Sequence, residues 1–102
     1  MAIFISRENS DRLGITGAQT TLALTVAGTE YSYTVPEGTK RLIIGLRSGS
    51  YAFTYGWAAS TRNFTVPAGV YRDIDQVYLS GHVLYVSCAD AGSQTLEIEV
   101  WT

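Results

Sequence analysis

The chain has 102 residues, of which 46% are hydrophobic and 16% charged, a composition typical of a folded protein rather than a disordered one. Seven Lys and Arg against nine Asp and Glu give a formal charge of −2 with no basic block, which argues against binding to nucleic-acid phosphates. No apolar run approaches the roughly 20 residues of a membrane helix. The start, MAIFISREN, has neither a basic leader nor a small-residue cleavage site. We therefore expect one domain, residues 1–102, made in the cytoplasm without a signal peptide or membrane segment.

The first part of the chain, residues 1–19, is predicted to form an N-terminal strand or arm and a loop, because residues 7–17 are polar and contain glycine. Beyond it, hydrophobic and polar residues alternate with period two, and helical periodicity is nearly absent. Period two is the signature of strands, and β-branched and aromatic residues fill these runs. The first two strands would each place one set of side chains on one face: Leu22, Leu24 and Val26, then Tyr31, Tyr33 and Val35.

The sequence Thr-Val-Pro-x-Gly occurs twice, at residues 34–38 and 65–69. Pro36 and Pro67 would each end a strand, because proline removes a ladder donor. Gly38 and Gly69 would supply the positive φ of a type II-like turn that starts at the preceding valine. Each unit continues with a strand, a Ser-Gly pair and another strand. We expect each Ser-Gly pair to close a tight hairpin, which gives an internal two-hairpin pseudo-repeat.

The run YAFTYGW places four aromatic side chains on one face of a strand, opposite Ala, Thr and Gly. Two interpretations remain open. The rings can form the core, or they can form an exposed platform for sugar stacking or subunit contact. The small, uncharged opposite face suits packing against another subunit. The four aromatic residues are Tyr51, Phe53, Tyr55 and Trp57.

The last strand, TLEIEVW, alternates Leu96, Ile98 and Val100 against Glu97, Glu99 and Trp101. Turn signals recur about every ten residues along the chain, which is the spacing of an antiparallel sandwich or small barrel. The predicted fold is therefore an all-β, antiparallel, jelly-roll-like β-sandwich of about eight or nine strands.

The sequence offers little for catalysis. The single His82 has no second His or Cys at metal-ligand spacing, and no serine nucleophile motif accompanies it. The pairs Asp73/Asp75 and Glu97/Glu99 are interpreted as solvated strand faces, because a domain this small can hardly build a glycosidase cleft or a calcium site. The single Cys88 is expected in the core. We predict no enzyme activity, catalytic residue, metal or cofactor.

In its size, its low cysteine content and the stretches TVPEGTKRLIIGLRSGSYAFTYGWA, TVPAGVYRDI and LEIEVW, the chain resembles the small virion structural proteins of tailed bacteriophages. Within that group it is most similar to capsid decoration, or cement, proteins with jelly-roll-like folds. The resemblance implies a dimer or trimer on the capsid surface of the virion, bound to the major capsid protein and bridging capsomers. Terminal arms and loops commonly make the capsid contacts in such proteins, which points to residues 1–17 here.

Two function classes follow from these observations. The first is a phage decoration protein that binds neither nucleic acid nor membrane. The second is a carbohydrate-binding or tail/baseplate module, in which Tyr51, Tyr55 or Trp57 would stack on a glycan while Arg62, Asp73 or Asp75 orients its hydroxyls. The candidate interface or binding residues are Arg7, Arg12, Tyr51, Tyr55, Trp57 and Tyr78.

Overall fold

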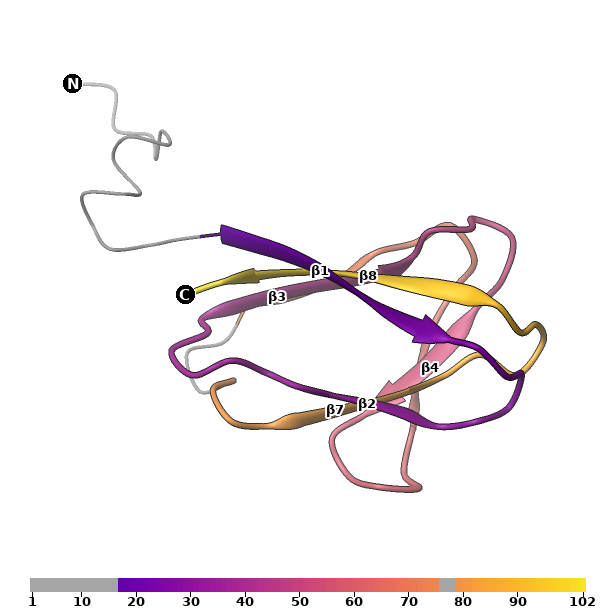
Figure 1. The fold of residues 1–102 in the computed structure, drawn as a ribbon, viewed down its shortest axis with the longest axis horizontal. Helices are drawn as coiled ribbons and strands as arrows, with labels where there is room; N and C mark the ends of the chain where they lie inside the picture. Colours follow the sequence, from indigo (N-terminus) through magenta and orange to yellow (C-terminus); the bar gives the residue numbers. More distant parts are fainter. Residues whose placement is uncertain (1–16, 76–78) are drawn as a thin grey trace.

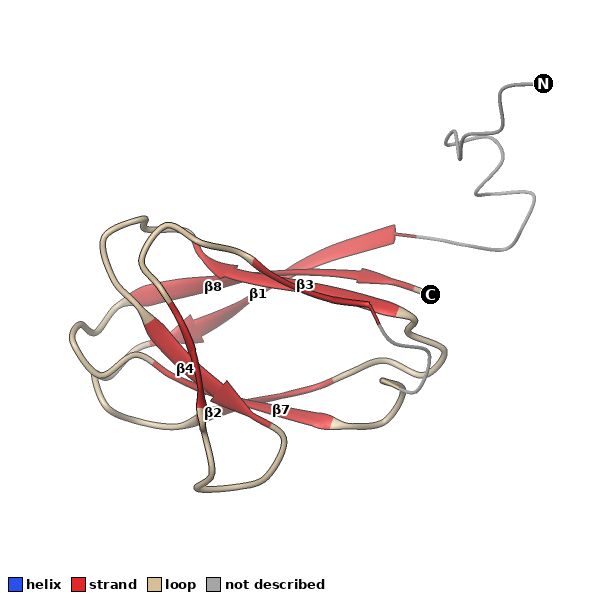
Figure 2. Cartoon of the chain, turned by 180° about the vertical axis from the view of Figure 1, so that it is seen from behind, coloured by secondary structure: helices blue, strands red, loops and turns tan. Residues whose placement is uncertain are grey.

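The computed structural model describes residues 17–75 and 79–102, and within these ranges it contains eight strands and no helix. The strands lie in two four-stranded sheets that stack face to face: sheet A has the order β1-β8-β3-β6, and sheet B the order β2-β7-β4-β5 (Figures 1 and 2). All strand pairs are antiparallel. The predicted all-β antiparallel β-sandwich is thus confirmed. The strands are β1 (Gly17–Leu24), β2 (Tyr31–Thr34), β3 (Arg41–Leu46), β4 (Phe53–Gly56), β5 (Phe64–Val66), β6 (Arg72–Asp75), β7 (Val83–Ser87) and β8 (Gln94–Trp101).

The strand pairing is nested. β1 pairs with β8, β2 with β7, β3 with β6 and β4 with β5. Two further pairings, β3 with β8 and β4 with β7, join these pairs into the two sheets. Of the consecutive strands in the described part, only β4 and β5 pair with each other, while every other connection crosses from one sheet to the other. The chain is therefore folded like a long doubled ribbon wrapped around one core.

The prediction that the two Ser-Gly pairs close hairpins is wrong. Ser48-Gly49 lies between β3 in sheet A and β4 in sheet B, and Ser80-Gly81 lies between β6 in sheet A and β7 in sheet B. A turn does form at Ser80-Gly81, where the His82 amide donates to the Leu79 carbonyl at 3.2 Å and Gly81 has a φ of 77°. The predicted turn is therefore present at Ser80-Gly81, but it leads the chain from sheet A to sheet B and does not join two paired strands.

The core lies between the two sheets and is filled by the inward-facing residues of the alternating strands. On β8, Leu96, Ile98 and Val100 are at most 5% exposed, while the intervening Glu97 and Glu99 point outward. Burying each such aliphatic side chain contributes about 1.5–3 kcal/mol to folding. The core residues are Leu24, Val35, Leu42, Ile44, Leu46, Phe53, Tyr55, Val66, Leu79, Leu84, Val86, Cys88, Leu96, Ile98 and Val100.

Val26, predicted to share a strand face with Leu22 and Leu24, is 57% exposed. β1 ends at Leu24, and the chain then turns, with the Thr29 amide donating to the Val26 carbonyl at 3.3 Å. The alternation of a strand no longer applies beyond its last paired residue. The prediction for Tyr31, Tyr33 and Cys88 is confirmed, since all three pack in or against the core.

The two Pro-x-Gly corners have the predicted glycine conformation, with φ of 84° at Gly38 and 77° at Gly69. The amides of Thr39 and Val70 donate to the carbonyls of the two prolines at 3.3 and 3.2 Å. Each turn therefore starts at the proline rather than at the preceding valine. The glycine falls at the third position, where a type II turn requires positive φ.

Replacing Gly38 by alanine should lower the free energy of unfolding by about 1 kcal/mol, because the left-handed conformation strains a residue that has a Cβ. No atom lies within 4 Å of a Cβ built at this position, so the effect would be conformational and not steric. Urea denaturation measures the change. Gly49→Ala is the matched control, because Gly49 lacks positive φ and its Cβ would make only an ordinary contact at 3.8 Å. Equal stability of the two variants would contradict the role assigned to the corner.

Candidate functional site

The outer face of sheet A carries most of the hydrogen bonds between two side chains in the described part of the chain. β8 is central in this sheet, so its outward carboxylates lie between residues of both neighbouring strands. In the pairing register Glu97 is opposite Thr21 of β1, and Glu99 is opposite Gln19. Both acids were predicted to lie on a solvated strand face, and the side chain of Glu97 is 38% exposed.

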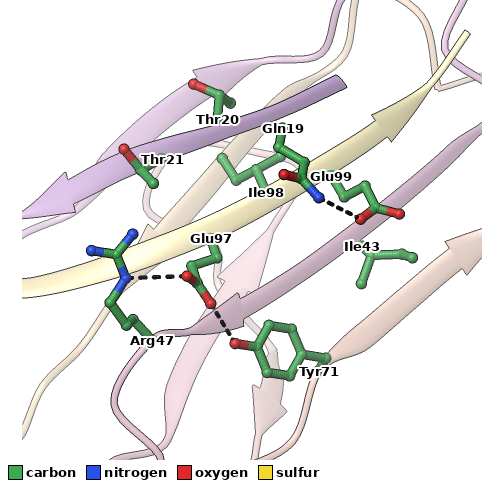
Figure 3. A pocket seen from close by; sticks show the side chains of 9 residues that line it. All are labelled: Gln19, Thr20, Thr21, Ile43, Arg47, Tyr71, Glu97, Ile98 and Glu99. Atoms are coloured by element: carbon green, nitrogen blue, oxygen red, sulfur yellow. Dashed lines mark hydrogen bonds and ion pairs between the residues drawn. The ribbon is translucent and has the colours of Figure 1, made fainter. Parts of the chain in front are cut away.

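Glu97 accepts hydrogen bonds from two neighbours at once. The Tyr71 hydroxyl donates to its Oε1 at 2.5 Å, and Arg47 Nε donates to its Oε2 at 3.1 Å (Figure 3). The hydrogen bonds from Tyr71 and Arg47 hold the pKa of Glu97 below its usual value. Bonding to the carboxylate also raises the pKa of Tyr71. The Glu97 carboxylate is therefore ionised and held in a fixed orientation.

Glu99 is held in a similar way. Trp101 Nε1 donates to Glu99 Oε1 at 2.7 Å, and Gln19 Nε2 donates to Oε2 at 3.3 Å. Further along the face, Arg41 forms a two-pronged pair with Asp73, with bonds of 3.0 and 2.6 Å that lower the pKa of the aspartate. Exposed pairs of this kind contribute little to stability. Their main effect is to fix the directions of the side chains.

Two aromatic rings on this face lie over glycines. A Cβ added at Gly45, in the middle of β3, would fall 2.2 Å from Cδ2 of Tyr71, and one added at Gly17 would fall 2.9 Å from the Trp101 ring. A glycine inside a strand commonly marks such a close approach. Tyr71 was not predicted as a site residue, and Gly45, a glycine within a strand, is the sequence signal that marks the approach of its ring.

An open groove of about 510 Å³ lies on this face, and its lining side chains come from β1, β3, β8, the residue after β3 and the residue before β6 (Figure 3). Its lining combines apolar, hydroxyl, amide and charged groups. The lining residues are Gln19, Thr20, Thr21, Ile43, Arg47, Tyr71, Glu97, Ile98 and Glu99.

The outer face of sheet B differs in character. Alternation places small or uncharged side chains outward on all four of its strands. The four strands, β2, β4, β5 and β7, contain no charged residue. The register places Ser32 opposite Tyr85, and Thr54 between Thr65 and Ser87. This confirms the expected small, uncharged face opposite the aromatic side chains of β4.

An ion pair joins the margin of sheet B to the β4–β5 loop, which passes over the outer side of Gly56, where an added Cβ would fall 2.0 Å from the Thr61 carbonyl oxygen and 3.0 Å from Arg62 Cα. Glu30, just before β2, pairs with Arg62 of the β4–β5 loop, and it also accepts the Ser60 amide at 2.9 Å. Ser60 has a φ of 62°, so the carboxylate holds a strained loop residue in place. The two charges at this margin thus neutralise each other and fix the loop.

The aromatic run YAFTYGW does not form one exposed platform. Phe53 and Tyr55 are core residues at 2% and 3% exposure, because they lie within β4 and face sheet A. Trp57, beyond the end of the strand, is half-buried and meets Tyr55 edge-on at 6.4 Å. Tyr51, before the strand, is exposed. Tyr55 is therefore corrected from a candidate surface residue to a core residue, with its hydroxyl accepting a hydrogen bond from Arg72 Nε at 2.9 Å.

The remaining candidates are dispersed. Arg7, Arg12 and Tyr78 lie outside the described residues. Asp73 and Asp75 are on β6 at the edge of sheet A, whereas Arg62 is at the margin of sheet B, so the structure does not bring them together around the aromatic rings.

Among the described residues there is no cluster of three or more His, Cys, Asp or Glu that could hold a metal ion, and no helix suited to crossing a membrane. No family model, curated protein sequence or solved structure matches the chain.

Acid should weaken the fold partly through Glu97. A carboxylate whose pKa is lowered by folding stabilises the native state above its unfolded pKa, with an ordinary value of 4.5, and this contribution is lost as the pH falls through the folded value. Melting temperatures should therefore fall below about pH 4.5, and Glu97→Gln should remove part of that fall. Glu37→Gln, on the exposed Pro36–Thr39 turn, is the control and should leave the acid profile of the wild type. Identical profiles for both variants would contradict the role of Glu97.

Proposed function

We propose that this protein is a non-enzymatic structural protein of a tailed-phage particle, a decoration or cement protein that self-associates and binds the major capsid protein on the capsid surface. Its place in the virion would be outside the shell, where it stabilises the head by bridging neighbouring capsomers. A position in the tail or baseplate is the alternative within the same class.

The observation that carries the proposal is that the strands of sheet B contain no charged residue, so their outward positions are uncharged. Ser32, Thr54, Thr65 and Tyr85 lie at such positions, and they come from all four strands of the sheet. Interface cores are depleted in charged residues, because desolvating a charge is costly, and they are enriched in tyrosine. Strand positions of this composition can be covered by another subunit without leaving an ion unpaired, since the charge of Arg62 in the loop over Gly56 is already paired with Glu30.

The nested strand pairing supports the jelly-roll part of the proposal. Pairing of the first strand with the last, the second with the seventh and so on inward is the arrangement of a doubled ribbon wrapped into two sheets. Jelly rolls of eight strands are common in viral capsid proteins. This likeness concerns the architecture only, since one fold serves many functions.

In this proposal many copies act together. Each protomer makes modest contacts, and linkage within an oligomer adds their effects because a second contact forms at a high effective concentration. The contacts to the shell would involve the N-terminal segment, including Arg7 and Arg12, as the resemblance to decoration proteins implies. Of the three rings that the sugar-stacking alternative would use, Tyr55 is buried and Trp57 is half-buried against it, so only Tyr51 is exposed.

The solution mass tests self-association. Light scattering coupled to size exclusion, across a dilution series, should give a dimer or trimer of the 11.1 kDa chain. Ser32→Lys combined with Thr65→Lys should shift the protein to monomer, because two charges would be desolvated in the interface. Ala23→Lys, on an exposed position of β1 in sheet A, is the control and should keep the oligomer. A wild-type monomer at all concentrations would contradict the proposal.

Binding to the shell is a separate measurement. The purified protein should co-sediment with empty phage heads that lack a decoration protein, and saturation should occur at a fixed number of copies per capsomer. An oligomer that binds no head, but does bind purified tails, would move the assignment to the tail.

A further inference from the structure

The groove on the outer face of sheet A differs from a solvated strand face in being both concave and lined by fixed groups. Its volume, about 510 Å³, lies within the roughly 300–1,000 Å³ typical of small-ligand sites. Such sites combine apolar or aromatic surface with a few polar groups at set positions. The groove has both, and it lies on the opposite side of the sandwich from the face proposed for self-association (Figures 1 and 3).

The aromatic surface is the ring of Tyr71. It lies over Gly45, where no side chain separates it from the sheet, and the residue is 49% exposed. Its hydroxyl bond to Glu97 fixes the ring against rotation away from the sheet. The ring is thus a fixed, accessible flat surface at the side of the groove. The C–H face of a pyranose can pack on such a surface, since aromatic faces carry partial negative charge.

The polar groups are Glu97 and Glu99, with Arg47 and Gln19 beside them. Each carboxylate accepts two hydrogen bonds from the protein, and a carboxylate has about four acceptor sites, so each can accept more. Because their neighbours already hold them in place, binding a ligand costs little side-chain entropy. Two fixed acceptors next to a guanidinium and an amide can bind a set of adjacent hydroxyl groups.

The charges select against ionic ligands. An anion in the groove would lie beside the two carboxylates, and the nearest cation, Arg47, is already paired with Glu97. A cation would have to displace Arg47 from the same carboxylate. A neutral sugar ring is not repelled by the two carboxylates, and it can bind without displacing Arg47.

We propose that the groove between β1, β8, β3 and Tyr71 binds a neutral saccharide, with Tyr71 stacking on the sugar ring and Glu97 and Glu99 accepting hydrogen bonds from its hydroxyls. This site uses none of the aromatic residues of β4. It does not depend on the proposed virion role, since it occupies the other outer face. On a particle surface it would give many copies of a weak sugar contact, which multivalency strengthens.

The test begins with the full chain on an array of neutral oligosaccharides ending in glucose, galactose, mannose, rhamnose or N-acetylglucosamine, with sialylated oligosaccharides as anionic comparators. The sugars that bind are then titrated into ¹⁵N-labelled protein and followed by NMR. We expect binding of at least one neutral sugar, with the largest shifts at Tyr71, Glu97 and Glu99. Binding of no sugar, or of sialylated sugars alone, would overturn the proposal.

Variants locate the site. Tyr71→Ala should weaken binding about tenfold or more, because it removes the stacking ring, and Glu97→Gln should do the same, because it replaces one carboxylate oxygen by an amide group that cannot accept a hydrogen bond. Tyr51→Ala and Glu37→Gln are the matched controls, because both are exposed residues outside the groove, and they should change the affinity less than about twofold. Equal losses in a variant and its control would overturn the assignment.

Two checks keep the result interpretable. If Tyr71→Ala does not fold, Glu97→Gln and Tyr71→Phe test the site instead. Tyr71→Phe keeps the ring and removes only the hydrogen bond from the Tyr71 hydroxyl to Glu97. All groove variants should retain the solution mass of the wild type. A sugar-binding monomer would therefore contradict the virion proposal alone, and an oligomer that binds no sugar would contradict the saccharide proposal alone.

Discussion

The pairing of β8 with both β1 and β3 is the interaction on which the rest of the structure depends. It joins β8, the last strand of the described residues, to β1, the first of them, along eight residue pairs, and to β3 along six. It also fixes the register of sheet A, because Leu96, Ile98 and Val100 fill the core only in this alignment. A shift by one residue would place Glu97 and Glu99 in the core, where an unpaired carboxylate is very costly. The same constraint that closes the core therefore also presents the polar groups of the groove.

The two outer faces follow from the same alternation but differ in chemistry. In sheet A the outward positions hold acids, bases and rings that bond to one another, with Glu97 linked to Arg47 and Tyr71. In sheet B they hold Ser, Thr, Val and Tyr on the described strands. The first face keeps polar groups in water at fixed positions, and the second loses little when water is removed. This contrast is the physical basis for placing subunit contacts on one face and ligand contacts on the other.

Local patterns in the sequence were sufficient for some features and not for others. Period two identified the inward residues of β8, and the Pro-x-Gly sequence identified the positive φ of Gly38 and Gly69, because both depend on a few neighbouring residues. The destination of a turn depends on distant strands, so Ser48-Gly49 and Ser80-Gly81 were wrongly assigned to hairpins. The candidate site was missed for the same reason. Tyr71 lies 26 residues before its partner Glu97 and covers Gly45, and no local spacing brings these three together.

The division of roles between the faces is tested most directly by paramagnetic relaxation in NMR, with a soluble gadolinium chelate that broadens signals accessible from solvent. In the wild-type protein, Thr21, Glu97 and Glu99 of sheet A should broaden strongly, while Ser32, Thr54 and Tyr85 of sheet B should be protected by a second subunit. Equal broadening on both sheets would show that sheet B faces solvent and would contradict the division. Protection of sheet A instead would mean that the groove, and not the uncharged face, is the subunit contact.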